Sequence, residues 1–266
     1  MPITKIRKHY MSYFSQRGQG APLAYASTST DPSLATLTGA KFETADGREF
    51  VLIQNGGTAL VSGNLIQGPV SIGSTHTDLA CAAAAIGATQ ITVTMGGTLA
   101  TANQYAGGFA VVNASTGIGQ TFRIASHPAA TSSGTCVLTL EDSVKVALSS
   151  SSKVTLQLNP YGAPNGTDVR TSGCVVCPTT LTGPIIGVTV SPIAASTTTV
   201  PSYGFIQSKG VVGCLNDANT AIGLGLMHST NTAGAVMSHV VATAAAVGTS
   251  HVAGVTTEVR PITIQL

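Results

Sequence analysis

The sequence predicts an all-β protein made of short-stranded antiparallel sandwich or barrel domains with an extended N-terminal arm. Apolar residues alternate with polar ones instead of recurring at helical spacing, which is typical of half-buried strands. Clusters of Gly, Pro, Ser and Asn separate these short segments, as expected of the turns between strands. Helical patterns are scarce, so we expect little besides strands and turns.

The first expected element is a hairpin in residues 41–53, where Asp46-Gly47 joins two β-prone runs. Both central residues of a type I′ turn need a positive φ, which Asp tolerates and Gly accepts freely. We therefore expect a two-residue turn at this point. Residues 55–57, Asn-Gly-Gly, then turn the chain into residues 58–61, so residues 41–62 are expected to form a β-meander.

The strands expected further along the chain show the same alternation. Val154, Leu156 and Leu158 share one face of their segment and polar residues occupy the other. Pro261 has no N–H to donate, so the C-terminal strand is expected to start there or to lie at a sheet edge. The other expected strands cover residues 90–95, 109–112, 135–140, 185–190, 203–207 and 236–241.

One short helical turn is expected over residues 78–85, with Thr77 as its cap and Gly87 as its end. The density of Pro, Gly, Ser and Thr between residues 159 and 182 predicts a linker. The expected organisation is therefore an N-terminal arm of residues 1–38, a first β domain of residues 39–160, a linker of residues 161–179 and a second small β-barrel domain of residues 180–266.

Charge is the most unusual part of the composition, because only 8% of the 266 residues are charged. An ordinary domain is about a quarter charged, so this surface suits permanent contact with copies of itself or with a large partner. We expect a homo-oligomer, a trimer in particular. The net charge of +2 predicts no nucleic-acid partner, and no apolar run reaches the roughly 18 residues of a membrane span.

The five cysteines are expected to be free thiols in a reducing cytoplasm, since their number is odd and their positions are scattered. Cys174 and Cys177 have the spacing of a zinc knuckle, but no second ligand pair follows them. The sequence therefore predicts no disulfide, no metal and no other cofactor.

Catalytic motifs are absent from the sequence, which has no HExxH, no P-loop and no Gly-x-Ser-x-Gly elbow. The six histidines are widely separated, and Glu141-Asp142 is the only pair of adjacent carboxylates. Adjacent residues on a strand face opposite sides, so that pair converges only in a turn. We expect no catalytic residues and no enzymatic activity.

The N-terminal arm is compositionally distinct, because its first 17 residues hold four of the twelve basic residues and no acidic one. Two interpretations stay open: a solvated terminus, or an arm that orders on a partner surface. In the second, basic residues face an acidic surface and aromatic residues fill its grooves. The candidate partner-binding residues are Lys5, Arg7, Lys8, Tyr10, Tyr13, Phe14 and Arg17.

Several segments carry a resemblance to a known family. Residues 47–67, 84–94 and 102–113 resemble capsid-associated proteins encoded beside the major capsid gene in tailed bacteriophages. Residues 203–210, Tyr-Gly-Phe-Ile-Gln-Ser-Lys-Gly, and the Gly/Ala/Val-rich run up to His251 are similar to the small β-barrel of phage capsid decoration (cement) proteins.

The resemblance implies a virion structural protein that is made in the host cytoplasm and sits on the outer capsid surface. It implies binding to the major capsid protein, often as a trimer at local threefold positions, with no catalysis and no cofactor. The chain is longer than one-barrel decoration proteins, so the role of its first β domain stays open. The alternatives are a phage tail or fibre module that binds a host receptor and, more remotely, an enzyme such as a β-sandwich hydrolase.

Overall fold

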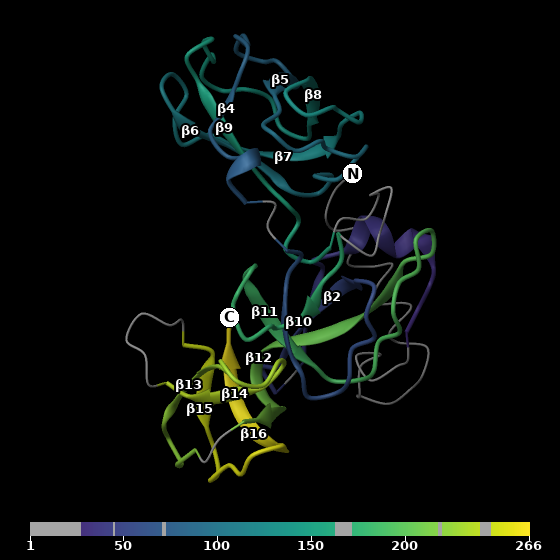
Figure 1. Ribbon diagram of the computed structural model, residues 1–266, viewed down its shortest axis with the longest axis vertical. Coiled ribbons are helices and arrows are strands. Elements are labelled where there is room, and N and C mark those ends of the chain that lie inside the picture. The colour runs from purple at the N-terminus through teal and green to yellow at the C-terminus, as the bar shows by residue number, and fades with distance from the viewer. Residues whose placement is uncertain (1–27, 45, 71–72, 163–171, 218–219, 240–245) are drawn as a thin grey trace.

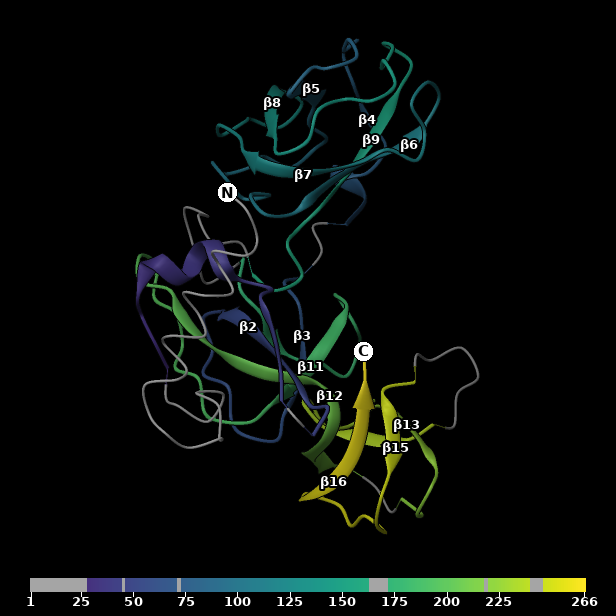
Figure 2. The same cartoon turned by 180° about the vertical axis from the view of Figure 1, so that it is seen from behind.

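The computed structural model describes residues 28–44, 46–70, 73–162, 172–217, 220–239 and 246–266. It confirms the all-β class: in these residues sixteen strands form two sheets, and the helical segments are the short 3-10 turns η2 (Pro32–Leu37) and η3 (Gly73–His76). The sheets form two lobes that lie end to end along the long axis of the molecule (Figure 1, Figure 2).

One lobe, which we call the inserted barrel, is the sheet β4-β9-β6-β7-β8-β5. A bridge between Cys81, just after β4, and Val93 of β5 joins the two ends of this order, so the sheet closes on itself. Val93, Phe122 and Leu138 are among the side chains that fill it. Its strands are β4 (Leu79–Ala80), β5 (Gln90–Thr94), β6 (Phe109–Ala114), β7 (Thr121–Ser126), β8 (Thr135–Leu140) and β9 (Lys153–Gln157).

The other lobe, the main lobe, takes its strands from both sides of the inserted barrel along the chain. The 15-residue strand β12 crosses it, pairing with β2 and β11 through its first half and with β16 through its second (Figure 1). The strands are β1 (Lys41–Glu43), β2 (Glu49–Asn55), β3 (Leu65–Gln67), β10 (Val175–Val176), β11 (Ile185–Thr189), β12 (Ser202–Asn216), β13 (Gly225–His228), β14 (Val236–Ser238), β15 (Gly248–Ser250) and β16 (Glu258–Gln265).

The main lobe contains two small barrels that share β12. The first barrel consists of β2, β3, β10, β11 and the first half of β12, and a parallel bridge between Asn55 and Cys174 closes it. The second barrel consists of the second half of β12 with β13, β14, β15 and β16, and the parallel pairing of Asn216 with Val236 closes it. In both barrels the closing bridge is made by an asparagine at the end of the first strand.

The two barrels match in strand register as well as in strand order. Val188 of the first barrel pairs with both Leu65 and Gln207. Thr249 of the second barrel pairs in the same way with Gly225 and Thr263. The main lobe is therefore a structural tandem repeat. In the first barrel the inserted barrel lies between β3 and β10. At the equivalent place in the second barrel, between β13 and β14, there is only the turn of residues 229–235.

The two barrel cores correspond position by position. Both are filled by aliphatic side chains and cysteines from equivalent strands. The first core includes Val51, Ile53, Ile66, Cys174, Ile186 and Ile206, and in the same order the second includes Val212, Cys214, Leu226, Val236, Val247 and Ile262.

This topology differs from the expected domain division. β2 and β3, expected in the domain of residues 39–160, pair with strands of the expected domain of residues 180–266. The inserted barrel takes up only residues 79–157. Linker composition could not reveal this, because pairing between distant segments, rather than Pro and Gly content, decides which strands share a sheet.

The expected hairpin forms, but its turn has three residues instead of two. Glu43 pairs with Glu49, and the backbone N–H of Thr44 donates to the carbonyl of Arg48 at 2.9 Å. Gly47 has a φ of 80°, and its N–H donates to the carbonyl of Thr44 at 2.9 Å. A glycine in the left-handed region that ends a three-residue loop is the other common hairpin solution.

The prediction of a helical turn over residues 78–85 is wrong. Leu79 and Ala80 form β4, and Ala84 makes an antiparallel bridge to Leu148. Asp78 has a φ of 55°, outside the right-handed helical region. A short Ala-rich run is a marginal helix by itself, so strand pairing decides its conformation.

Candidate functional site

The seven arm residues predicted to bind a partner, Lys5 to Arg17, lie outside the described residues. The part of the expected arm that is described starts at Thr28 and lies against the first barrel. The N–H of Ala194 donates to the Thr28 hydroxyl at 2.6 Å, and Ser29 makes an antiparallel bridge to Tyr203. The last residues of the expected arm are therefore part of the folded main lobe.

This N-terminal segment, residues 28–40, covers the outer face of the first barrel. Leu34 and Leu37 from η2 pack against Leu52 of β2 and Tyr203 of β12. Leu52 is 1% exposed and Tyr203 is fully buried, although both point away from the barrel core. The segment also completes the edge of β2, because the N–H of Leu52 donates to the carbonyl of Ala40 at 3.0 Å.

The equivalent face of the second barrel has no such cover among the described residues. By register, Gly213 corresponds to Leu52, and Val259 corresponds to Tyr203. Val259 is 54% exposed and Val211, on the same face, is 49% exposed. Beside them lies a hollow of about 330 Å³, lined also by Gly63 and Pro261 and by no charged side chain.

The strand edge beside this face is partly occupied: the N–H of Leu215 donates to the carbonyl of Gly63 at 2.7 Å, and the carbonyl of Val211 accepts from Nε2 of Gln207 at 2.9 Å. Gly213 lies between these two bonds, and its position opposite Pro261 sets the direction of its backbone groups.

The carbonyl of Pro261 accepts from the N–H of His251 at 3.3 Å, on the side of β15. Pro261 therefore forms a non-hydrogen-bonded pair with Gly213, and the N–H and carbonyl of Gly213 point to the other side of β12. The prediction of a strand start or a sheet edge at Pro261 is wrong: Pro261 lies inside β16, which pairs with both β12 and β15. Its missing donor falls just beyond the end of β15.

A second feature is a group of buried polar side chains in the inserted barrel. His127 receives the backbone N–H of Tyr105 on Nε2 at 3.0 Å, and its Nδ1–H donates to the carbonyl of Pro128 at 2.8 Å. His76 donates from Nε2 to the carbonyl of Thr98 at 2.9 Å, and its Nδ1 is hydrogen-bonded to the Tyr105 hydroxyl. Because Nε2 of His127 accepts a backbone N–H, the ring of His127 is neutral in this arrangement.

Cys136 lies beside His127, but the two side chains do not form the thiolate–imidazolium pair of a reactive cysteine site. The Sγ of Cys136 is 3.6 Å from Nδ1 of His127, whose proton is already donated to Pro128. Burial raises the pKa of the Cys136 thiol, and burial lowers the pKa of His127. An activated thiol needs shifts in the opposite directions, so this group has a structural role.

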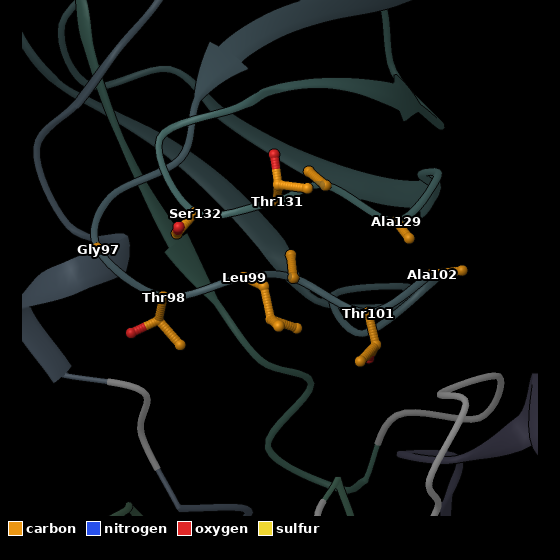
Figure 3. Close-up of a pocket in the computed structure, with 10 residues that line it drawn as sticks. Gly97, Thr98, Leu99, Thr101, Ala102, Ala129, Thr131 and Ser132 are labelled. Atoms are coloured by element: carbon orange, nitrogen blue, oxygen red, sulfur yellow. The ribbon is translucent and has the colours of Figure 1, made fainter.

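An open hollow of about 780 Å³ lies on the surface of the inserted barrel. Two loops run side by side there, joined by the bridge between Ala100 and Ala130, and Thr98, Leu99 and Thr101 project from one of them (Figure 3). The lining consists of Gly, Ala, Leu, Thr and Ser, without a titratable side chain. It can contact a surface but offers no acid, base or nucleophile of the usual strength.

Metal ligands do not gather in the part of the chain that the structure describes: no group of three or more His, Cys, Asp or Glu side chains is close enough to hold an ion. All five cysteines are unpaired and buried. Cys174 and Cys177, the pair with zinc-knuckle spacing, point into different barrel cores. No helix among the described residues is long and apolar enough to cross a membrane.

The comparisons with known proteins give no match: no family model, no curated protein and no solved structure is similar to this chain.

The uncovered face of the second barrel was not predicted from the sequence, although the sequence contains a pattern that indicates it. Residues 210–215, Gly-Val-Val-Gly-Cys-Leu, are apolar at both alternating sets of positions. Such a run is typical of a strand that is covered on both faces. Only one face, that of Val212 and Cys214, is covered by the described residues.

Proposed function

We propose that this chain is a virion structural protein, a capsid decoration or cement protein that binds and stabilises the assembled lattice of the major capsid protein. In this proposal it acts without catalysis or cofactor, on the outer surface of the capsid. A partner that binds only the assembled lattice stabilises it by mass action, in proportion to RT ln(1 + [L]/Kd).

The observation that carries the proposal is the chemistry of the exposed surface. In the described part of the chain, every exposed large hydrophobic side chain is Val, Ile or Leu, and these side chains occur on both lobes. Charged side chains on this surface are scarce, and some of them pair with each other, as in Arg48–Asp46 at 2.7 Å and Arg123–Glu141 at 3.3 Å. A surface with few charges and many aliphatic side chains favours lasting contact with another protein surface.

The arm supplies a second contact in this proposal. Lys5, Arg7, Lys8 and Arg17 face acidic groups on the capsid. Exposed ion pairs contribute only about 0 to 1 kcal/mol each and are screened by salt. These residues therefore govern the salt dependence of binding more than its strength at physiological ionic strength.

The proposal implies a major capsid protein encoded beside this chain, and the test uses capsids assembled from that protein. The full-length protein is mixed with these capsids, and bound copies are located by electron cryomicroscopy. Ordered density on the outer surface at regular lattice positions is expected. Failure to bind intact capsids, with binding instead to isolated tails or to host cell envelopes, would support the tail or fibre alternative.

A matched pair of variants then separates the arm from the body. Deleting residues 1–20 removes Tyr10, Tyr13 and Phe14 as well as the four basic residues, so it is expected to reduce occupancy on capsids sharply while leaving circular dichroism unchanged. Replacing the four basic residues with glutamine is expected to weaken binding mainly at low ionic strength, where the Debye length is longest. Occupancy equal to that of the full chain after deletion would show that the body alone makes the contact.

A further inference from the structure

We propose that the uncovered face of the second barrel, around Val211, Val259 and Pro261, binds the N-terminal arm of a second copy of this chain. Tyr10, Tyr13 and Phe14 are the apolar anchors of this contact. The inference goes beyond the capsid assignment and does not depend on it, since both partners are copies of the same chain. It also assigns the aromatic residues to a neighbouring copy instead of to capsid grooves.

The first barrel serves as the template for this contact. Its outer face is covered by a chain segment that brings two leucines, Leu34 and Leu37, onto Leu52 and Tyr203. The same segment donates and accepts backbone hydrogen bonds with Leu52, at 2.8 Å from Gly39 and 3.0 Å to Ala40. The binding mode combines apolar contact with strand-edge pairing.

The second barrel presents the same two elements without a described occupant. Val211 and Val259 supply the exposed apolar surface, and Gly213 supplies one backbone N–H directed away from β16. The edge groups on either side of it are already bonded, Leu215 to Gly63 and Val211 to Gln207. The side chain of Val259 lies over Gly213, where an added Cβ would be only 2.9 Å from its Cγ1. The room for a side chain from outside is therefore the adjoining hollow of about 330 Å³. An aromatic ring suits this site better than an aliphatic one because it contributes more contact area with few rotatable bonds.

The N-terminal arm is the occupant because of its position and its composition. The described chain starts at Thr28, so 27 residues precede it, and they include Tyr10, Tyr13 and Phe14. An extended chain spans up to about 3.3 Å per residue, so the arm can reach a neighbouring molecule. The hollow has no charged lining to oppose the basic residues that flank the aromatic ones.

We assign the bound arm to a second copy of the chain because this also accounts for the self-association expected of a chain with 8% charged residues. Each copy offers one arm and one face, which makes the contact heterologous. A heterologous contact closes into a ring when its rotation permits, and a trimer is one such ring. An arm bound within its own chain would leave the molecule a monomer.

The experiment uses full-length chains and light scattering behind size exclusion, at micromolar concentration. The face variant carries V211N and V259N, because asparagine removes apolar contact without adding charge. The arm variant carries Y10A and F14A. The control is V137N, which changes an exposed strand valine on the inserted barrel, 39% exposed. Circular dichroism checks that all of them fold.

The wild type and V137N are expected to be oligomers, whereas the face variant and the arm variant are each expected to be monomers, with association weakened at least about tenfold. Mixing the two monomeric variants restores one contact, because one has an intact face and the other an intact arm. The mixture is therefore expected to form a heterodimer.

Three results would overturn the inference: a monomeric wild type, a face variant that associates like V137N, or a mixture that stays monomeric. The last result would place the arm on its own chain. None of these outcomes bears on binding to capsids. Conversely, a protein that does not bind capsids would still be expected to show these molar masses in light scattering.

Discussion

The first and second barrels of the main lobe have the same strand order and register but differ in what covers them. The first carries the N-terminal segment on its outer face and the inserted barrel between β3 and β10. The second has only a short turn at the equivalent connection and leaves Val211 and Val259 exposed. The core of such a barrel therefore specifies the fold, and its outer face is available for attachments.

The largest expected effect tests whether the two cores are equivalent. Ile206 and Ile262 occupy matching positions and are 0% and 2% exposed. Replacing either with alanine is expected to lower the free energy of unfolding by about 2 to 5 kcal/mol, through lost burial and the cavity left behind. Urea denaturation followed by circular dichroism measures both.

The control for that pair is Ile222→Ala, since Ile222 is 70% exposed. Its effect is expected to stay within about 0.5 kcal/mol. If Ile262→Ala behaved like this control while Ile206→Ala was severe, the second barrel would not be a packed unit comparable with the first.

The asparagines that close the barrels provide the next comparison. The Nδ2 of Asn55 donates to the carbonyls of Ala194 and Thr58 at 2.8 and 2.9 Å, whereas the Nδ2 of Asn216 donates to the carbonyl of Val255 at 3.3 Å. A buried carbonyl left unsatisfied costs about 1 to 3 kcal/mol. Asn55→Ala is expected to destabilise more than Asn216→Ala in the same urea assay.

If both asparagine variants lost the same free energy of unfolding, the longer hydrogen bond of Asn216 would contribute as much as the shorter ones of Asn55. No loss in either variant would show that these side-chain hydrogen bonds do not stabilise the strand ends at which the barrels close.

Removing the cover of the first barrel is expected to have a smaller effect on stability. Leu34→Asn with Leu37→Asn takes partly buried apolar surface away from Leu52 and Tyr203. Each substitution is expected to cost roughly 1 to 2 kcal/mol, because these leucines are only partly buried. Binding of a hydrophobic dye such as ANS is expected to rise as the face becomes exposed. Unchanged stability and dye binding would show that the segment does not protect the face.

The pH dependence distinguishes the inserted barrel from the main lobe. Burial, and to a lesser degree the nearby His76, lowers the pKa of His127 below its ordinary value of 6.5, with Cys136 and Tyr105 also beside the ring. The unfolded state then takes up a proton at a higher pH than the folded state. The free energy of unfolding is therefore expected to fall as the pH drops below about 6.5.

This pH effect is expected to be the smallest and to be reduced by His127→Gln, measured by urea denaturation at pH 7.5 and pH 5.5. A slope that is unchanged in the variant would assign the pH dependence to other groups.

Much of the strand content could be predicted from the sequence, because alternation is a local property. The expected strands at residues 90–95, 135–140 and 153–158 correspond to β5, β8 and β9. β7 was missed although Phe122 and Ile124 alternate with polar residues there. The tandem repeat was also missed, since repeats are detected through similar sequence. Equivalent core positions such as Ile53 and Cys214 are both apolar and buried but differ in size and identity.

The candidate surface could be predicted only in part. The apolar run of residues 210–215 indicates a strand covered on both faces, but the sequence does not show that one cover is missing. That difference depends on where the N-terminal segment docks, and both barrels offer it an apolar face. The seven predicted arm residues lie outside the described residues, so their role stays a prediction.

Hydrogen exchange tests the central claim most directly, because it compares the two equivalent strand edges in one experiment. The amide of Leu52 is bonded to Ala40 and is expected to be protected in both the full chain and a chain lacking residues 1–20. The amide of Gly213 is expected to be protected only in the full chain at concentrations where it associates. Equal exchange at Gly213 in the two proteins would contradict docking of the arm on the second barrel.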